Sequence, residues 1–371
     1  MQQEEESTIS LKRRLDQQES LDREEAIRNT IVCFEKWDMT RLNHIKTLKL
    51  PPEIKRTLNI QFEPGAPRIR INYSTLKGDT KGRVYARVVK HSDRYKRRKI
   101  EKEGSYVYES DVHPREEDMD GGGGLQSLCG WIRKQVAHEN YRDYDISNCA
   151  PTLLQQILEK AGLCPRELVQ YNTQRDAIFR RYAHIANQGE VKKAFLVVLH
   201  MGATDDRFPE TWRLKNALKA SLIRLSKSNL EYGQLYDRCM VACRYKYQKR
   251  KYADMVINLQ NRTLGKFCAT VWNRVEHQVL MSMREYFVNV EHYDAKHMVL
   301  CFDGIMIEKK MPEEKVDFDA LCLYVEEQTS FRVKIEEKSL MPSEKDMAFY
   351  NGTTPIVCKE KKKHIFQFWI W

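Results

Sequence analysis

The sequence predicts an α+β fold with three parts: a basic N-terminal module of helix and short strands, an antiparallel sheet, and a largely helical region. Two stretches at 68–73 and 83–89 alternate between apolar and polar or basic residues, which indicates strands with one basic face. From Leu125 onward, helical periodicity dominates. Two short apolar segments at 144–146 and 297–302 interrupt it and predict strands of a sheet.

Length and charge restrict the class of protein. The chain has 371 residues, of which 42% are hydrophobic, so it is long enough for a buried core and two or three lobes. Its formal net charge of +11 favours a polyanionic partner, and nucleic acid is the first candidate. A soluble protein with a basic surface explains the net charge equally well.

Cysteine usage and hydropathy indicate a reducing compartment. The 10 cysteines are spread along the chain without C-x-x-C pairs, often inside apolar runs. They indicate reduced, mostly buried thiols, and no structural zinc site is expected. The charged N-terminal segment lacks the apolar core of a signal peptide, and no long apolar run follows. We therefore expect an intracellular, soluble protein with no membrane partner.

Residues 1–124 are expected to form the basic N-terminal module. Apolar residues recur at helical spacing in the segment 19–50 and predict an amphipathic helix. The glycine run at 121–124 indicates a hinge and the boundary to a second region, 125–371.

Basic side chains of this module are candidates for contacts with nucleic-acid phosphates. Arg83 opens the second predicted strand, and Arg97 and Arg98 belong to a basic cluster at 91–100. A solvated loop explains that cluster equally well.

Two aspartates stand at the ends of predicted strands. Asp145 lies in a strand that leads through a turn into a helix at 152–158, and Asp303 lies between two apolar strands. Phosphoryl transfer to a growing strand needs two divalent cations ~3.5–4 Å apart, and Mg²⁺ prefers oxygen ligands held on rigid supports. We therefore predict that Asp145 and Asp303 meet as metal ligands.

Each aspartate also has a purely structural interpretation. Ser147 and Asn148 are suitable caps for the helix that follows Asp145. Asp303 with Gly304 is a favoured residue pair for a type I′ hairpin turn. The occurrence of both segments in one chain favours the metal site.

A third segment lies between the aspartates. From Gly189 through Lys192 and Lys193 to Gly202, the sequence predicts a helix that begins with basic residues and ends at a glycine. In this order, the three segments resemble the palm and fingers of family A DNA polymerases and single-subunit phage-type RNA polymerases. The shared features are a D-x-S motif, a K-x8-G helix and an apolar hairpin carrying an aspartate. The resemblance covers about residues 140–310 and rests on order and spacing.

The chain departs from that family at several positions. Met201 stands where an aromatic residue precedes the glycine, Gly189 where an arginine is expected, and Phe302 where a histidine precedes the second aspartate. DNA-synthesising members carry a glutamate at the position of Ala150. The small residue favours ribonucleotide use, or relaxed sugar discrimination, as in a primase or an RNA polymerase.

The resemblance implies a template-directed nucleotidyltransferase, either a small DNA or RNA polymerase or a primase-like enzyme. It places a palm-like antiparallel sheet and helical fingers in 125–371, with a thumb-like or nucleic-acid-guiding module before them. Asp145 and Asp303 would bridge two Mg²⁺ or Mn²⁺ ions, the Ile146 carbonyl would complete a coordination shell, and Lys193 would neutralise the incoming triphosphate. The other residues implied at the nucleotide are Ser147, Ala150, Lys192, Met201 and Gly202.

The implied partners are nucleoside triphosphates, a DNA or RNA template with its primer, and accessory replication or transcription proteins. Gln260, Asn261 and Arg262 fall where the family contacts template and primer. Asn273 is a further candidate, whereas Glu276 is expected on the surface of an amphipathic helix.

The segment 244–252 interleaves basic and aromatic side chains, among them Arg244 and Lys246. This pairing suits a single nucleic-acid strand, because cations meet phosphates and rings meet bases. A solvated basic helix is an equally good explanation.

Two other functions fit part of this pattern. A metal-dependent nuclease also uses paired aspartates and a basic cleft, and Asp143 beside Asp145 supports it. A non-catalytic nucleic-acid-binding replication protein with a polymerase-like fold would explain the departures in the fingers helix.

Overall fold

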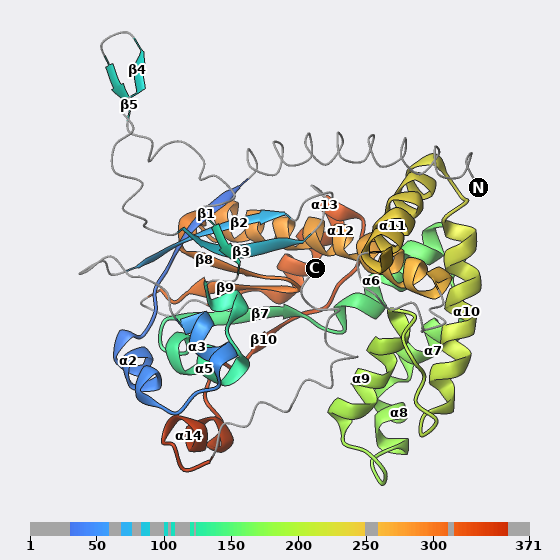
Figure 1. The fold of residues 1–371 in the computed structure, drawn as a ribbon, viewed down its shortest axis with the longest axis horizontal. Helices are drawn as coiled ribbons and strands as arrows, with labels where there is room; N and C mark the ends of the chain where they lie inside the picture. Colours follow the sequence, from blue (N-terminus) through green and yellow to red (C-terminus); the bar gives the residue numbers. More distant parts are fainter. Residues whose placement is uncertain are drawn as a thin grey trace. The chain divides into compact units, whose positions relative to one another are not determined.

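The computed structural model describes residues 30–58, 68–75, 83–89, 100–102, 105–107, 119–121, 124–248, 259–310 and 315–354. These residues form helices together with antiparallel sheets, which confirms the α+β class (Figure 1). Arg97 and Arg98, which are predicted to contact nucleic-acid phosphates, lie outside the described residues.

The described residues belong to two compact units. Those of the helical unit lie within Ser147–Gln278, and those of the sheet unit lie within Glu19–Ile146 and Val279–Trp371. The boundary predicted after residue 124 lies inside the sheet unit.

The first sheet of the sheet unit has the order β1-β2-β3-β6, with all neighbours antiparallel. Its strands are β1 (Ile31–Glu35), β2 (Ile69–Thr75), β3 (Val84–Val89) and β6 (Met119–Gly121). The strands β2 and β3 confirm the two predicted from alternation. A separate pair consists of β4 (Ile100–Lys102) and β5 (Ser105–Val107).

The helix predicted over residues 19–50 is wrong at Ile31–Glu35, because these residues form the strand β1. Within that strand, Cys33 and Glu35 are buried while their neighbours are partly exposed, which is the period-two pattern of a sheet. Its apolar and β-branched residues pair with β2, and this pairing outweighs the weak helical periodicity. The helix of this segment, α2, spans only Met39–Thr47.

The second sheet has the order β10-β7-β9-β8 and is also antiparallel throughout. Its strands are β7 (Tyr141–Ile146), β8 (Met298–Cys301), β9 (Gly304–Glu308) and β10 (Ile335–Lys338). Helices separate β7 from β8, and α13 (Phe318–Thr329) separates β9 from β10. This is the β-α-β-β-α-β arrangement of a split βαβ, or ferredoxin-like, motif. Strands β7 and β8 confirm the two predicted from apolar segments.

One face of this second sheet packs on helices. The Tyr144 ring lies 5.1 Å from that of Phe287 and 5.8 Å from that of Phe318, measured between centroids. These two phenylalanines belong to α12 (Leu259–Asn289) and α13. Because side chains alternate along a strand, Asp143 and Asp145 point to the opposite face from Tyr144.

The remaining helices of the sheet unit are short. They are α3 (Pro52–Leu58), α4 (Gly124–Ser127), α5 (Gly130–Ala137) and α14 (Glu344–Tyr350), with the 3₁₀ turn η4 (Ala295–His297).

The last residue of the glycine run is fixed by packing. Gly124 has a φ of +72°, and a Cβ there would lie 2.7 Å from Glu35 Oε1. Glu35 is fully buried and accepts hydrogen bonds from Tyr73 Oη (2.7 Å), Trp37 Nε1 (2.9 Å) and Leu125 N (2.7 Å). Burial raises the pKa of Glu35, and the three donors oppose the rise. A carboxylate under the start of α4 therefore requires glycine at position 124.

The helical unit contains α6 (Cys149–Lys160), α7 (Arg166–Thr173), α8 (Arg175–Arg181), α9 (Gln188–Leu199), α10 (Pro209–Leu225), α11 (Leu230–Gln248) and the first part of α12. Its core includes stacked rings of Tyr171 and Phe195, with centroids 4.4 Å apart. The helical character predicted for this region is confirmed.

The thiols of the described residues are free and mostly buried, as predicted. Burial raises the pKa of Cys33 to about 12 and that of Cys164 to about 11, so both are protonated at neutral pH. Among the described residues, no helix is both long enough and apolar enough to cross a bilayer.

Candidate active site

The second sheet brings Asp145 and Asp303 side by side. Asp145 on β7 pairs with Gly304 on β9, and Asp303 immediately precedes that glycine. The Ile146 amide also donates a hydrogen bond of 2.8 Å to the Asp303 carbonyl. The negative charge of Asp303 also acts on Asp143, which lies two residues before Asp145 on β7. The two aspartates therefore share one corner of the sheet, although 157 positions separate them along the chain.

Gly304 is required by the closeness of β7. A Cβ at Gly304 would lie 2.5 Å from the Tyr144 carbonyl oxygen and 3.0 Å from Asp145 Oδ1. The turn before it consists of Phe302 and Asp303, and neither residue takes a positive φ. The type I′ interpretation is wrong, since such a turn needs positive φ at both central residues. The glycine allows the strands to approach, and Asp303 lies at the tip.

A third carboxylate and a lysine adjoin this pair. Asp143 lies two residues before Asp145 on the same face, and Lys338 on β10 pairs with Asp143. The Lys338 ammonium forms a salt bridge with Asp145 Oδ2. The Asp145 side chain is 12% exposed and that of Lys338 is 50% exposed.

The electrostatics of Asp143 reflect this crowding. Burial raises the pKa of Asp143 most, the positive charges of Arg133 and Lys338 lower it, and the negative charge of Asp303 raises it again. Arg133 lies on α5, so helix and sheet both contribute to the field at these carboxylates. Sequence reasoning missed Arg133 and Lys338, because neither lies in a recognisable motif.

One predicted nucleic-acid contact lies beside the Asp303 turn. The Arg83 guanidinium lies over the Phe302 ring, 5.2 Å from its centroid, and the Tyr85 ring meets the same ring edge-on at 5.4 Å. Tyr85 lies near the start of β3, and Arg83 is the residue immediately before that strand. The first sheet therefore contributes a cation and an aromatic ring to the neighbourhood of Asp303.

The residues after Asp145 belong to the helical unit. Asn148 takes a left-handed conformation with a φ of 53°, and its side chain makes no capping hydrogen bond. Its Nδ2 instead donates to Asn172 Oδ1 at 2.9 Å. The capping interpretation is therefore wrong, and α6 begins at Cys149 without a side-chain cap. Ser147 and Ala150 are both partly exposed around this turn.

The predicted fingers helix is α9. It begins with a capping box between Asn187 and Glu190, and Lys192 and Lys193 are exposed on its first turns. At its end Met201 is buried with a φ of 56°.

Gly202 follows where the chain turns back on the helix. Its amide donates to the Val197 carbonyl at 2.9 Å, and a Cβ there would lie 2.5 Å from Val197 Cγ1. Local packing alone therefore explains the glycine at position 202, which also belongs to the family motif. Its contact with a nucleotide stays a prediction.

Helix α12 crosses the end of α9. A Cβ at Gly265 would clash with the His200 carbonyl, and the His200 and Trp272 rings meet edge-on at 4.8 Å. Gln260 and Arg262 are exposed and Asn261 is partly exposed in the first turn of α12.

The later part of α12 corrects one expectation. Glu276 is fully buried, not on the surface, and lies 3.7 Å from the Cys149 thiol that donates to it. Asn273 is partly exposed. Burial lowers the pKa of His277. The apolar periodicity missed this burial because α6 packs on the side of α12 that carries Glu276.

The predicted basic and aromatic segment is only partly described. Arg244 is exposed near the end of α11, and Lys246 lies in the same helix, but its side chain is outside the described part.

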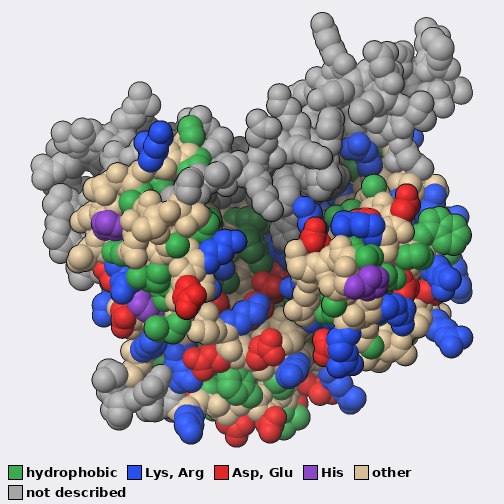
Figure 2. Space-filling model, turned by 90° about the horizontal axis from the view of Figure 1, so that it is seen from below, with side chains coloured by type: hydrophobic (Ala, Val, Ile, Leu, Met, Phe, Trp, Pro, Cys, Tyr) green, Lys and Arg blue, Asp and Glu red, His purple; other side chains and the backbone are tan. Residues whose placement is uncertain are grey.

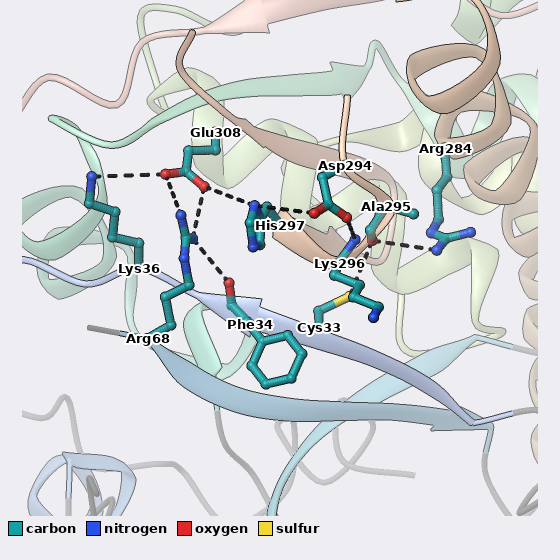
Figure 3. Close-up of polar contacts among 10 residues, drawn as sticks. All are labelled: Cys33, Phe34, Lys36, Arg68, Arg284, Asp294, Ala295, Lys296, His297 and Glu308. Atoms are coloured by element: carbon teal, nitrogen blue, oxygen red, sulfur yellow. Dashed lines mark hydrogen bonds and ion pairs between the residues drawn. The ribbon is translucent and has the colours of Figure 1, made fainter. Parts of the chain in front are cut away.

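A second ionic cluster lies at the other end of β9 (Figure 3). Glu308 receives Arg68 at 2.8 Å, Lys36 at 3.8 Å and His297 at 3.8 Å, and His297 also meets Asp294 at 3.6 Å. This Glu308 cluster joins β9 to β1 and to the residue before β2. Arg68 and Lys36 supply the positive charge beside Glu308.

Charge on the surface is mixed. On the face shown in Figure 2, lysines and arginines are interspersed with aspartates and glutamates. The net positive charge therefore does not form one uniform field on that face.

No protein-family model matches this chain, and no curated protein sequence matches it at a significant level. In the described part of the chain, no group of three or more His, Cys, Asp and Glu side chains is arranged to hold a metal ion. The case for a metal at Asp145 and Asp303 accordingly rests on a pair of carboxylates supplemented by backbone carbonyls and water.

Proposed function

We propose that the chain is a template-directed nucleotidyltransferase, a small polymerase or primase-like enzyme that adds nucleotides to a 3′-hydroxyl. The observation that carries the proposal is the position of Asp145 and Asp303 at one corner of a split βαβ sheet. The resemblance to a polymerase palm required two aspartates, far apart in sequence, to meet on neighbouring strands. A structure with these residues on separate elements would have removed its basis.

Charge balance supports a cation site at this corner. Asp303 is close enough for its negative charge to raise the pKa of Asp143, and Asp145 lies on the same face of β7 as Asp143. Close carboxylates repel one another unless a cation lies between them. The Lys338 ammonium already lies on Asp145, which shows that this carboxylate accepts a positive partner. The donor set consists of hard oxygens, which suit Mg²⁺ or Mn²⁺.

In this proposal Asp145 and Asp303 would hold two divalent ions, and the Ile146 carbonyl would be a further ligand. Such ions lower the pKa of an attacking hydroxyl and stabilise the charge of the transferring phosphoryl group. The role of the sheet is to hold both carboxylates rigidly: Asp145 lies inside a strand paired on both sides, and Asp303 lies in a two-residue turn.

The first sheet supplies a nucleic-acid contact near these carboxylates. Arg83 over the Phe302 ring combines a cation with an aromatic surface, and Tyr85 adds a second ring. That combination suits a phosphate with its adjacent base. Template and primer would approach the Asp303 turn along β3.

The helical unit carries the residues that the resemblance assigns to the nucleotide. Lys192 and Lys193 are exposed on α9 and would neutralise a triphosphate, and the small Ala150 would not block a 2′-hydroxyl. We propose ribonucleotides as the preferred substrates on the basis of Ala150. Gln260, Arg262 and Arg244 are exposed candidates for contacts with template or primer.

A metal-dependent nuclease is the second candidate, and Asp143 favours it. This residue places a third carboxylate on the same face as Asp145, and nucleases often gather several carboxylates around their ions.

The deciding experiment supplies primed and unprimed templates with Mg²⁺ and either ribonucleotides or deoxyribonucleotides. Extension that is lost in Asp145→Asn and Asp303→Asn, and retained in the matched control Asp206→Asn on an exposed loop, supports synthesis. Strands shortened by the wild type and not by the two variants would establish the nuclease. Binding of the template without any reaction would establish the non-catalytic protein.

A further inference from the structure

We propose that Lys338 is a tethered cation that occupies the Asp145 carboxylate in the metal-free protein and is displaced when a divalent ion binds. This inference rests on the metal site of the proposed function and adds how its affinity is set. Lys338 competes with the ion for one oxygen, so the metal binds more weakly than the two aspartates alone would allow.

Strand register delivers the lysine to this place. Ile335 at the start of β10 is buried and pairs with Ile146, which aligns Lys338 with Asp143 at the other end of the strand. From there the ammonium reaches diagonally to Asp145 Oδ2. Because the register is fixed by four consecutive residue pairs between β10 and β7, the sheet and not a flexible loop directs the lysine at the carboxylates.

The two partners differ in their freedom to move. Asp145 is held within a central strand and its side chain is only 12% exposed, whereas half of the Lys338 side chain is exposed. A lysine has a flexible four-carbon stem and a strongly hydrated charge, so it can return to water without disturbing the sheet. Displacement would therefore move the lysine and leave the carboxylate in place.

The Glu308 cluster shows what a permanent pair in this protein looks like. Arg68 donates to both carboxylate oxygens of Glu308, at 2.8 and 2.9 Å, and its side chain is 25% exposed. A guanidinium fork of this kind has a fixed geometry that a metal ion would have to break at two points. Lys338 instead offers a single point charge on one oxygen.

Carboxylate crowding explains why the metal-free protein uses such a cation. The negative charge of Asp303 opposes ionisation of Asp143, and the positive charge of Lys338 offsets that repulsion. A divalent ion relieves it better, and it repels the ammonium at the same time. Two cations that exclude each other at one oxygen reduce each other's affinity by the same factor.

The test measures binding of Mn²⁺ alone, by electron paramagnetic resonance, without nucleotide or nucleic acid. We expect Lys338→Met to bind Mn²⁺ about three- to tenfold more tightly than the wild type, in line with a partly exposed ion pair. Lys338→Gln is the second variant and should behave alike. The control Lys334→Met removes a lysine that is 80% exposed just before β10 and should leave the affinity unchanged.

Thermal unfolding separates displacement from simple repulsion at a distance. If Lys338 occupies Asp145, the variants melt at a lower temperature than the wild type without metal and at the same temperature when saturated with Mn²⁺. Repulsion without displacement would leave the wild type less stable than the variants when both are saturated with Mn²⁺, and that result would overturn the inference.

The outcomes for the proposed function are distinct. Mn²⁺ binding by the wild type that is lost in Asp303→Asn, together with unchanged affinity in both Lys338 variants, would refute the role of Lys338 and leave the metal site standing. Mn²⁺ binding that Asp303→Asn does not affect would refute the metal site itself.

Discussion

The strand β9 has carboxylates at both ends, and the two ends differ in how their charge is balanced. At the Glu308 end, Arg68 and Lys36 supply permanent positive charge, and His297 lies within 3.8 Å. At the Gly304 end, Lys338 forms a salt bridge with Asp145, and the charges of Lys338, Asp303 and Arg133 on α5 all act on Asp143. The first arrangement neutralises itself and ties two sheets together. In the second arrangement the three aspartates outnumber the two cations, Lys338 and Arg133. This excess of negative charge distinguishes a candidate cation site from a structural ionic cluster.

The largest expected effect separates the two ends by activity. Asp303→Asn should reduce nucleotide addition by on the order of a thousandfold, since it removes a ligand of the ions that stabilise the transition state. Glu308→Gln, an equally conservative change at the other end of β9, should retain most of the activity per folded molecule. Primer extension under single-turnover conditions measures both. Equal losses of activity in the two variants would mean that the two ends of β9 do not differ in function.

Stability should respond in the opposite order. Glu308→Gln leaves Arg68 without a charged partner in a partly buried place and should lower the free energy of unfolding by about 1–3 kcal/mol. Burial disfavours the charged form of Asp143, so Asp143→Asn should leave the protein as stable as before or slightly more stable. Urea unfolding at neutral pH without divalent ions compares them. A larger loss in Asp143→Asn would mean that the aspartates are already balanced.

Binding of nucleic acid should depend on the Gly304 end. Arg83→Ala should weaken primer–template binding about three- to tenfold and reduce the slope of log Kd against log salt by about one, as expected for one lost phosphate contact. The control Arg332→Ala removes an arginine that is 83% exposed on the sheet unit and should change neither quantity. Titration by fluorescence anisotropy at several salt concentrations gives both values. An unchanged slope in Arg83→Ala would remove Arg83 from the interface.

The smallest effect concerns Glu35, a carboxylate that has neutral donors in place of cations. Its pKa is raised by burial, so the folded state binds its proton more tightly than the unfolded state does. This contribution to stability is complete below the ordinary glutamate pKa and disappears as the pH rises through the raised value. The stability of the wild type relative to Glu35→Gln should therefore increase as the pH falls through that window. Unfolding curves between pH 4 and 8, about the range in which carboxylates and histidines titrate, would show it. A difference that decreases on acidification would contradict the assignment.

Local patterns were sufficient for several strands of the fold. Alternation at 68–73 and 83–89 identified β2 and β3, and apolar segments identified β7 and β8. The same approach failed at β1, where five residues pair with a distant strand against a weak helical pattern. It failed again at Glu276, because the burial of one side of α12 depends on helices that the periodicity of α12 does not contain.

The sequence by itself determined the α+β class and several of the strands, and it singled out Asp145 and Asp303, whose role as metal ligands stays a prediction. These follow from patterns within a few residues, or from the order of three motifs. Only the tertiary structure decided that Lys338 reaches Asp145 from 193 positions away, that Arg83 lies over Phe302, and that Glu308 is paired with Arg68 and Lys36. The reason is physical: charge balance depends on which strands become neighbours and in which register, and a linear pattern does not contain either.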